Sequence, residues 1–405
     1  MATNNNNKAL NVPHLRFPEF SGEWKKVRLG EICNMLCGYA FNGEDIVEQG
    51  SYLLMRGINI TEGSIRHSSE LDRYYSGSIE KLDKYKLAVG DLVIGMDGSK
   101  VGRNSAIVSS YEDGSYLVQR VCRIKSSIGN NYILQFINNT KFHQYVDTVK
   151  TSSAIPHISL GDIQNFRISI PPTQDETDKI AKLFLLLDER IATQNKIIED
   201  LKKLKSAISK QVFAQEPNGW SRLDTLFSKG KAGGTPTSTN KEYYNGEIPF
   251  LSINDITKQG KYVRYTENHL SQSGLENSSA WVVPKYSLIM SMYASVGLVT
   301  INEIPITTSQ AMFAMQLKDK DLLDYLYYYL SYFKYRHIHK YLETGTQSNI
   351  NADIVRGIMI PTYGYSRNME IASTLQSIDV KIDNELSVLK LFNRQKNYLL
   401  SQMFI

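Results

Sequence analysis

Two dipeptides in this chain carry side chains that can read the edges of nucleic acid bases. Gln119-Arg120 and Ser309-Gln310 both lie on predicted strands. The Gln amide and the Arg guanidinium can each form two parallel hydrogen bonds, a geometry that matches adenine and guanine edges in the major groove. Gln and Arg are also common solvent-facing residues on strands. The two dipeptides are therefore candidates either for base readout or for an ordinary surface.

Further polar and glycine-rich segments occur at matched places in the two halves of the chain. A DNA-reading surface needs phosphate contacts that position it as well as base contacts, and the backbone of a glycine-rich loop can come close to a phosphate. Each segment could instead be a plain surface turn or hairpin. The additional candidate DNA-contacting residues are Gly38, Tyr39, Phe41, Asn42, Asp97, Ser99, Lys100, Ser152 and Ser153 in the first half and Lys229, Lys231, Gly233, Gly234, Thr235, Thr237, Ser291, Tyr293, Ser295, Thr346 and Gln347 in the second.

Residues 325–341 interleave aromatic with basic residues, in the order YLYYYLSYFKYRHIHKY. Aromatic rings beside cations can stack on unpaired bases, but this spacing is also typical of a helix whose apolar face packs in a core. We favour the core helix. Arg336 and Lys340 could then contact phosphates from its outer face.

The composition predicts a globular protein of two to three domains. The 405 residues exceed one ordinary core, and 42% hydrophobic and 21% charged residues are near globular averages. The chain has no apolar run of about 18 residues, which predicts no membrane span, and its N-terminus lacks the pattern of a secretory signal. Three cysteines are too few for a disulfide framework, so the predicted location is the cytoplasm.

The formal net charge of +5 permits nucleic acid binding without requiring it. Residues 1–170 hold 19 Lys and Arg against 17 Asp and Glu, and residues 217–362 hold 14 against 12. A DNA-binding surface therefore requires positive charges that gather on one face.

Signatures of catalysis and cofactor binding are not found. The chain has no Gly-x-Gly-x-x-Gly fingerprint and no Gly-x-x-x-x-Gly-Lys-Ser/Thr loop. His337 and His339 lack the spacing of a helix-borne zinc pair, and Cys33 and Cys37 have no nearby Cys or His to complete a tetrahedral zinc site. We therefore predict no catalytic residue and no metal in the chain. An enzyme with an unrecognised site remains an alternative.

An internal repeat is the strongest signal in the sequence. At an offset of about 190 residues, the segment GDIQNFRISIP of residues 161–171 aligns with ADIVRGIMIP of residues 352–361. Trp24, near the start of the first copy, corresponds to Trp220 in the second. One unit has therefore been used twice.

Each copy begins with a lobe of mostly β character, because short β-branched runs alternate with Gly, Asn and Asp. After Pro172 the pattern changes. Residues 173–213 contain no Gly or Pro and place apolar residues three and four apart, and residues 369–403 repeat this stripe. The sequence thus predicts a long amphipathic helix after each lobe.

A helix of about 40 residues is roughly 60 Å long, too long to lie against one small lobe. We expect each helix to pair with its copy, which predicts an α+β fold with two mostly-β lobes and an antiparallel coiled-coil spacer. Gln194 and Glu385 interrupt the apolar stripes, and such polar residues commonly fix register. Packing of each helix onto its own lobe alone is the alternative. The expected boundaries are a flexible leader at 1–20, the first lobe at 21–172, the first helix at 173–215, the second lobe at 216–362 and the second helix at 363–405.

This order of elements resembles the specificity subunit of Type I restriction-modification systems, and the resemblance covers nearly the whole chain. Its most specific stretches are Gly233-Gly234-Thr235-Pro236 followed by IPFLSINDI at residues 248–256, the run 291–297, and the run 168–172 that leads into the helix. The first lobe departs from this pattern, since it has Gly38-Tyr39-Ala40-Phe41 instead.

The resemblance implies two target-recognition domains, each of which reads one half of a bipartite site in double-stranded DNA. The helical spacer would set the gap between the half-sites and dock two modification (methyltransferase) subunits, and restriction (motor and nuclease) subunits would complete the enzyme. The chain itself would be non-catalytic and would hold no cofactor, whereas S-adenosylmethionine, ATP and Mg would bind to partner subunits. The alternative is a two-headed protein scaffold without DNA specificity.

Overall fold

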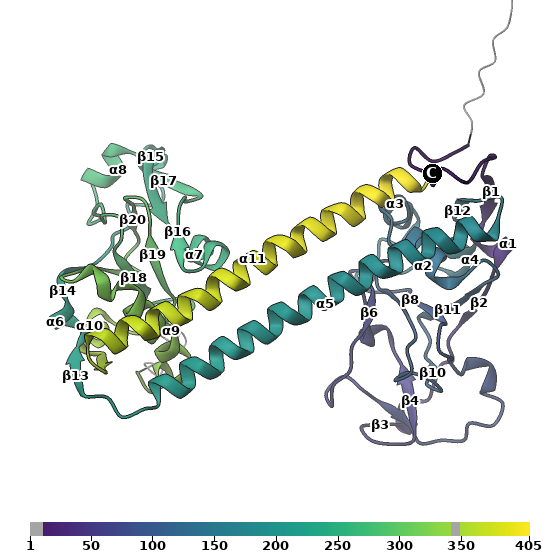
Figure 1. Ribbon diagram of the computed structural model, residues 1–405, viewed down its shortest axis with the longest axis horizontal. Coiled ribbons are helices and arrows are strands. Elements are labelled where there is room, and N and C mark those ends of the chain that lie inside the picture. The colour runs from purple at the N-terminus through teal and green to yellow at the C-terminus, as the bar shows by residue number, and fades with distance from the viewer. Residues whose placement is uncertain (1–10, 342–348) are drawn as a thin grey trace, which may run out of the picture. The chain divides into compact units, whose positions relative to one another are not determined.

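The computed structural model describes residues 11–341 and 349–405. The chain divides into two compact units, Met1–Asn195 with Val388–Ile405, and Lys196–Ser387. Each unit holds one lobe together with part of each of two long helices, α5 (Gln174–Phe213) and α11 (Tyr365–Met403) (Figure 1). The predicted tandem α+β architecture is therefore confirmed.

Two four-stranded sheets form the first lobe. One has the order β2-β11-β8-β9 and is antiparallel, and the other has the order β10-β4-β7-β3. The elements are β1 (Lys25–Arg28), α1 (Leu29–Ile32), β2 (Cys33–Cys37), β3 (Ile46–Val47), β4 (Tyr52–Met55), β5 (Ile60–Thr61), β6 (Ser64–Ile65), β7 (Tyr74–Tyr75), β8 (Leu92–Gly95), β9 (Ser105–Ile107), β10 (Tyr116–Leu117), β11 (Val121–Ser126), α2 (Asn130–Ile137), α3 (Thr140–Val149), α4 (Leu160–Asn165) and β12 (Arg167–Ile170).

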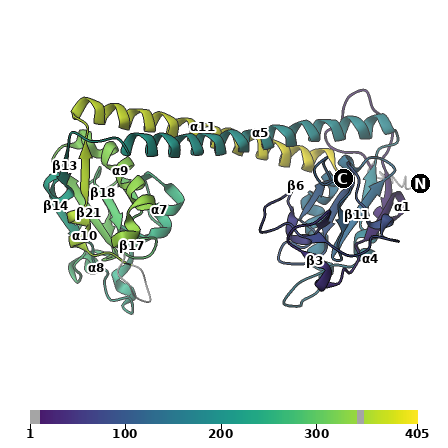
Figure 2. The same ribbon diagram turned by 90° about the horizontal axis from the view of Figure 1, so that it is seen from below.

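The second lobe repeats this plan with a five-stranded sheet, β14-β21-β18-β19-β16, and a three-stranded sheet, β17-β15-β20. Strands β14, β21 and β18 lie side by side (Figure 2). The elements are β13 (Gly219–Arg222), α6 (Leu223–Leu226), β14 (Phe227–Ala232), β15 (Tyr244–Leu251), α7 (Ile253–Gln259), β16 (Tyr262–Val263), β17 (Asn268–Leu270), α8 (Gln272–Glu276), β18 (Leu288–Ser291), β19 (Val299–Asn302), β20 (Thr307–Thr308), β21 (Met312–Leu317), α9 (Leu323–Arg336), α10 (Ala352–Gly357) and β22 (Met359–Thr362).

The first three residues of the central strands β8 and β18 are all apolar, because each sheet is covered on both faces. In β8, Leu92 faces the cluster formed with the helices, whereas Val93 faces a second cluster beneath the smaller sheet. In β18, Leu288 and Ile289 divide between two clusters in the same way. Successive side chains of a strand point to opposite faces. Burial of both faces therefore favours apolar residues at successive positions.

The Pro-ended strands close each lobe on itself. Strand β12 pairs antiparallel with β1, the first strand of its lobe, and β22 pairs with β13 in the same way. In the second lobe this register places Trp220 opposite Pro361. The repeated Trp and Pro of the sequence thus mark the two ends of each lobe, which meet in a two-stranded ribbon.

Both long helices run antiparallel within each unit. In the first unit, Lys396 Nζ lies 2.5 Å from Asp188 Oδ1. In the second unit, Lys205 Nζ lies 2.5 Å from Asp379 Oδ1. The coiled-coil pairing predicted from the two apolar stripes is confirmed. Some apolar residues of the stripes nevertheless face solvent, namely Ile197, Leu204 and Leu386.

Each long helix ends with a phenylalanine in the core of the lobe encoded by the other copy. Phe404, just after α11, is 2% exposed, and its ring centroid lies 4.7 Å from that of Phe136 in the first lobe. Phe213, at the end of α5, packs in the second lobe at 5.3 Å from the ring of Tyr329. Tyr329 belongs to the aromatic helix α9, and Tyr325 of the same helix is 1% exposed. The preference for a core helix at this segment is confirmed.

Residues 11–20, part of the predicted flexible leader at 1–20, are packed against the first lobe. Arg16 Nε and Nη2 donate to the two carboxylate oxygens of Glu176, each at 2.7 Å. Trp24 Nε1 donates to the same carboxylate at 3.2 Å. Glu176 is completely buried, so its carboxylate ties this N-terminal segment to the first turn of α5. Trp24 N–H also donates to Asn11 O at 2.8 Å.

Across residues 11–341 and 349–405, no helix combines the length and the apolar character that crossing a membrane requires.

Candidate nucleic-acid interface

Candidate residues from separate parts of the first lobe meet at one end of the β2-β11-β8-β9 sheet. Gly38 N–H donates to Val121 O at 2.9 Å, and Tyr39 N–H donates to Leu117 O at 2.9 Å. Gln119 N–H in turn donates to Tyr39 O at 2.8 Å. These bonds place the loop of residues 38–42 directly beside the Gln119-Arg120 pair.

The loop that follows β8 joins the same group. Met96 N–H donates to Arg120 O at 2.9 Å, and Ile158 N–H donates to Met96 O at 3.0 Å. Gly98 N–H donates to Pro156 O at 3.0 Å. Residues 97–100 therefore lie between the Gln119-Arg120 pair and the loop that carries Ser152 and Ser153. We call residues 38–42, 97–100, 119–120 and 152–153 the first loop face.

The second lobe uses the same backbone bonds at equivalent positions. Gly233 N–H donates to Met312 O at 3.1 Å, and Gly234 N–H donates to Thr308 O at 2.9 Å. Met292 N–H donates to Ala311 O at 2.7 Å, which corresponds to the bond between Met96 and Arg120.

The segment that follows residues 342–348 contacts the loop after β18 at the equivalent place, because Ile350 N–H donates to Met292 O at 3.0 Å. Thr346 and Gln347 lie outside the described residues. We call residues 229–237, 291–295 and 309–310 the second loop face.

Many candidate side chains of the first loop face reach solvent. Tyr39 is 39% exposed, and Phe41, Gly38 and Asp97 are half-buried. Lys100 Nζ lies 3.1 Å from Glu62 Oε1, and both side chains are more than half exposed. An exposed ion pair of this kind contributes little stability, so Lys100 can exchange Glu62 for a phosphate at small cost. The other exposed candidates are Asn42, Ser99, Gln119, Arg120, Ser152 and Ser153.

Positive charge on the second loop face is carried by the edge strand β14. Lys229 and Lys231 alternate with Gly230 and therefore share one face of the strand, and Lys229 Nζ lies 4.4 Å from the centre of the Trp281 ring. Thr235 Oγ1 donates to the side-chain oxygen of Gln310, which joins two candidate segments. Thr235, Thr237, Tyr293, Ser295 and Gln310 are exposed, and Ser309 is half-buried.

Three candidate residues have a different role from the one expected from sequence. Ser291 is completely buried, because its hydroxyl donates to Ser295 O at 2.8 Å and accepts from Leu298 N–H at 2.9 Å. It supports the loop from beneath and does not reach the surface. Gly233 and Gly234 are buried as well, and a Cβ on them would lie 1.9 Å from Thr308 O and 2.2 Å from Ser279 Oγ. Close approach to protein atoms explains both glycines.

Aromatic residues that the sequence did not single out border the first loop face. The Tyr39 ring lies 5.3 Å from the ring of Tyr85, and the Phe41 ring lies 4.7 Å from that of Tyr75. Lys84 Nζ lies 4.9 Å from the centre of the Tyr85 ring. These contacts join segments that are far apart in the chain, so no local pattern indicated them.

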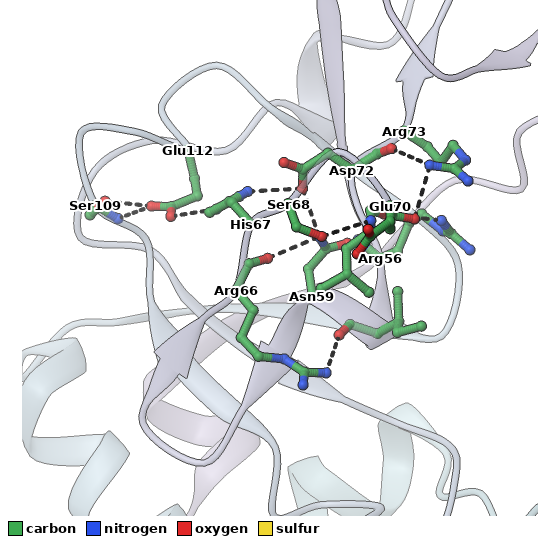
Figure 3. Close-up of polar contacts among 12 residues, drawn as sticks. Arg56, Asn59, Arg66, His67, Ser68, Glu70, Asp72, Arg73, Ser109 and Glu112 are labelled. Atoms are coloured by element: carbon green, nitrogen blue, oxygen red, sulfur yellow. Dashed lines mark hydrogen bonds and ion pairs between the residues drawn. The ribbon is translucent and has the colours of Figure 1, made fainter. Parts of the chain in front are cut away.

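The segment that carries Arg66 also borders the first loop face. Residues 57–66 and residues 97–104 line a common pocket of about 430 Å³ that includes the side chains of Arg66, Asp97 and Lys100. Arg66 Nη2 donates to Ile58 O at 3.0 Å, and the Arg66 side chain extends away from the network that anchors the segment (Figure 3).

That anchoring network is centred on His67 (Figure 3). Its Nδ1 lies 3.0 Å from Asp72 Oδ1 and its Nε2 lies 2.9 Å from Glu112 Oε1. Asn59 Nδ2 also donates to Asp72 Oδ1 at 3.0 Å, and Ser109 donates to Glu112 through its backbone and its hydroxyl. Burial opposes the ionisation of Glu112, but the hydrogen bonds outweigh burial and hold its pKa below the ordinary value.

Comparisons with known proteins agree on one family. The Type I restriction modification DNA specificity domain matches residues 21–203 and again residues 217–389. The MjaIX specificity subunit of a Type I restriction enzyme from Methanocaldococcus jannaschii is 27% identical over 158 residues, 38% of this chain and 36% of that protein. The EcoAI specificity subunit from Escherichia coli is 29% identical over 187 residues, 45% of this chain and 31% of that protein. The match thus spans about a third of these relatives.

Solved structures share the fold. The S subunit of a Type I restriction-modification system from M. genitalium superposes with a TM-score of 0.61 at 14% identity, covering 97% of this chain and 99% of that chain. A chain from a structure of type I R-M complex assembly gives a TM-score of 0.57 at 17% identity, covering 95% and 98%. With two matched domains that span most of its length, this chain belongs to the family of Type I restriction-modification DNA specificity proteins.

Proposed function

We propose that this chain is the sequence-reading subunit of a Type I restriction-modification enzyme and that each loop face reads one half of a bipartite site in double-stranded DNA. The main support for this proposal is that matched backbone hydrogen bonds hold the same loops together in both lobes. Backbone bonds do not depend on side-chain identity. The exposed residues of each face can therefore differ while the loops stay in place, as two independent half-sites require.

Within each loop face we assign different contacts to different residues. The exposed amides and guanidinium of Gln119, Arg120 and Gln310 suit base edges in the major groove. Lys100, Lys229 and Lys231 suit phosphates, which position a protein on the duplex without reading its sequence. The remaining exposed candidates supply hydroxyl and amide groups around these contacts.

The long helices are proposed to set the gap between half-sites. A helix of about 40 residues spans roughly 60 Å, while the major groove returns every turn of roughly 34 Å. The helices also expose apolar side chains that no core requires, such as Leu391, which is 63% exposed, and Tyr398, which is 60% exposed. Exposed apolar groups of this kind favour a protein partner, and we assign them to two modification subunits.

We place the chemistry in the partners. Methyl transfer with S-adenosylmethionine would belong to the modification subunits, and ATP with Mg would serve the restriction subunits. The isolated chain should then neither methylate nor cleave DNA, and equilibrium dialysis should detect no binding of S-adenosylmethionine. Methylation by the purified chain alone would instead favour an enzyme with an unrecognised site.

Footprinting of the chain assembled with its modification partner tests the proposal. We expect two protected segments separated by an unprotected gap, and sequencing of methylated DNA from the host should report the same bipartite site. A complex that assembles but protects no defined sequence would favour a protein scaffold. An insertion of one or two helical turns at the exposed position Lys202, with the matching insertion in α11, should lengthen the gap and leave both half-sites unchanged.

A further inference from the structure

Two cysteines lie opposite each other beneath the first loop face. Cys37, the last residue of β2, pairs with Cys122 of the antiparallel strand β11. The next position along the strands is hydrogen bonded, because Gly38 N–H donates to Val121 O at 2.9 Å. Hydrogen-bonded and non-hydrogen-bonded pairs alternate in an antiparallel ladder, so the cysteines form a non-hydrogen-bonded pair, whose Cα atoms lie about 4.5 Å apart.

That separation lies within the range of about 4.4–6.8 Å found for Cα atoms in disulfides. The side chains of opposed residues point to the same face of a sheet, and both cysteines contact the same apolar cluster. All three cysteines are free thiols in the structure. Cys33, the third, is opposed by Ser126 and not by a thiol.

The two thiols differ in reactivity. Cys37 is half-buried, whereas Cys122 is completely buried. Interaction with the neighbouring Cys122 thiol lowers the pKa of Cys37 to about 7 and raises the pKa of Cys122. The Cys37 thiol donates to Met96 Sδ at 3.7 Å, and the Cys122 thiol donates to Arg123 O at 3.5 Å. Since the thiolate is the nucleophilic form, Cys37 is the attacking group and Cys122 is placed to resolve the product.

We propose that Cys37 and Cys122 are a reversible disulfide-forming site whose reactant is a hydroperoxide. The Cys37 thiolate attacks hydrogen peroxide, which breaks the O–O bond and gives Cys37 sulfenic acid and hydroxide. The Cys122 thiol then attacks the sulfenic sulfur and displaces water, and the disulfide forms. Two thiols and one peroxide thus give one disulfide and two waters. A dithiol reductant reverses the reaction by two thiol exchanges.

Oxidation at this place should disturb the first loop face. Directly opposed strand residues have Cβ atoms about 4.5–5.5 Å apart, and disulfides have Cβ atoms about 3.5–4.5 Å apart with a mean of about 3.8 Å, so the bond draws the end of β2 toward β11. The next residue has no room for this movement, because even a Cβ on Gly38 would lie 2.1 Å from Val118 O. Residues 38–42 must then shift against Gln119-Arg120.

The effect should be confined to one half-site, a consequence that rests on the proposed function. In the second lobe the equivalent pair, one residue before Gly233, is Ala232 opposite Phe313. These side chains cannot cross-link. The second loop face is therefore an internal control within the same molecule.

Peptide mapping of the full chain after treatment with hydrogen peroxide tests the chemistry without DNA. We expect one intramolecular cross-link, Cys37 to Cys122, which is lost on reduction, absent in Cys37→Ser and retained in Cys33→Ser. At pH 7 iodoacetamide should label Cys37 before Cys33 and Cys122, whose thiols have raised pKa values. Sulfinic acid at Cys37 without a cross-link, or a cross-link that involves Cys33, would overturn the assignment.

Footprinting of the assembled complex then tests the consequence. Peroxide should remove protection at the half-site of the first lobe and spare the other half-site, a dithiol should restore it, and Cys37→Ser should be insensitive. A quantitative cross-link that leaves both half-sites protected would overturn the coupling to the loop face. A complex with no footprint even when reduced would contradict the proposed function, while the peptide map still decides the disulfide.

Discussion

The two loop faces share a backbone plan and differ in what they expose. The strand that enters the first face carries Asn34 and Leu36, whereas the equivalent strand β14 carries Lys229 and Lys231 on one face. The first face is instead bordered by aromatic contacts around Tyr39. The same backbone hydrogen bonds can therefore be kept in both lobes while the exposed residues differ.

The largest expected effect comes from exchange of a whole lobe. Replacement of residues 217–362 by the equivalent lobe of a relative should change one half of the recognised site completely and leave the other half unchanged, because each frame is complete within its own lobe. Sequencing of methylated DNA gives both halves in one measurement. A change in both halves would contradict the assignment of one loop face to one half-site.

The next largest effect concerns the two helix-end phenylalanines. Phe404→Ala and Phe213→Ala should each lower the stability of the lobe in which the ring is buried by about 3–5 kcal/mol, because each leaves a cavity among aromatic rings. Hydrogen exchange can follow the two lobes separately.

We expect strong loss of amide protection in the first lobe for Phe404→Ala and in the second lobe for Phe213→Ala. Phe392→Ala is the matched control, because Phe392 is half-buried on α11 near Arg190. Equal destabilisation by the control would contradict a specific role of the helix ends.

Substitution of the base-reading amides should have a smaller effect, restricted to one half-site. Gln119→Ala and Gln310→Ala should each reduce discrimination at one base pair by about 1–3 kcal/mol, or roughly 5- to 150-fold in relative affinity. Competition binding against single-base variants of each half-site measures this. Gln316→Ala, on β21 of the second lobe, is a control outside the loop face, and a similar loss from it would argue against readout by Gln310.

The smallest expected effect is an acid sensitivity of the first lobe. The pKa of Glu112 is lower in the folded state than in the unfolded state. Its carboxylate therefore stabilises the fold above the unfolded-state pKa of about 4.3, and this stability is lost as the pH falls through the folded-state pKa. A variant with Trp220→Phe and Trp281→Phe leaves Trp24 as the fluorescent reporter of this lobe. The urea concentration at the midpoint of its unfolding should decrease as the pH falls below about 4.3. Glu112→Gln should reduce the loss of unfolding free energy over this pH range by about 1 kcal/mol.

Much of the fold could be predicted because its signals are periodic. The stripe of apolar residues in α5 and its copy in α11 indicated two long helices, and the paired Trp and Pro residues marked the ends of each lobe. The aromatic run of α9 was assigned to a core because its spacing is helical. By contrast, Ile197 and Leu204 fit the stripe yet face solvent. Periodicity identifies a helix but does not decide where a partner covers it.

The loop faces were only partly predictable. Polar loops at matched positions in the two copies indicated candidate segments, and backbone hydrogen bonds join the described ones. Ser291 has the residue type and position expected of a DNA-contacting side chain, but its hydroxyl forms its hydrogen bonds within its own loop. The bordering residues Tyr85, Arg66 and Trp281 gave no signal in sequence, since each reaches its loop face through a tertiary contact.

The repeat, the two lobes and the helix after each could be predicted from the chain alone, because hydrophobic period and turn residues are local properties. The meeting of the loops, the burial of Phe213 and Phe404, and the position of Cys37 opposite Cys122 depend on the tertiary fold. These features follow from strand register. Pairing between distant strands depends on how whole sheets pack their faces, and no short stretch of sequence specifies it.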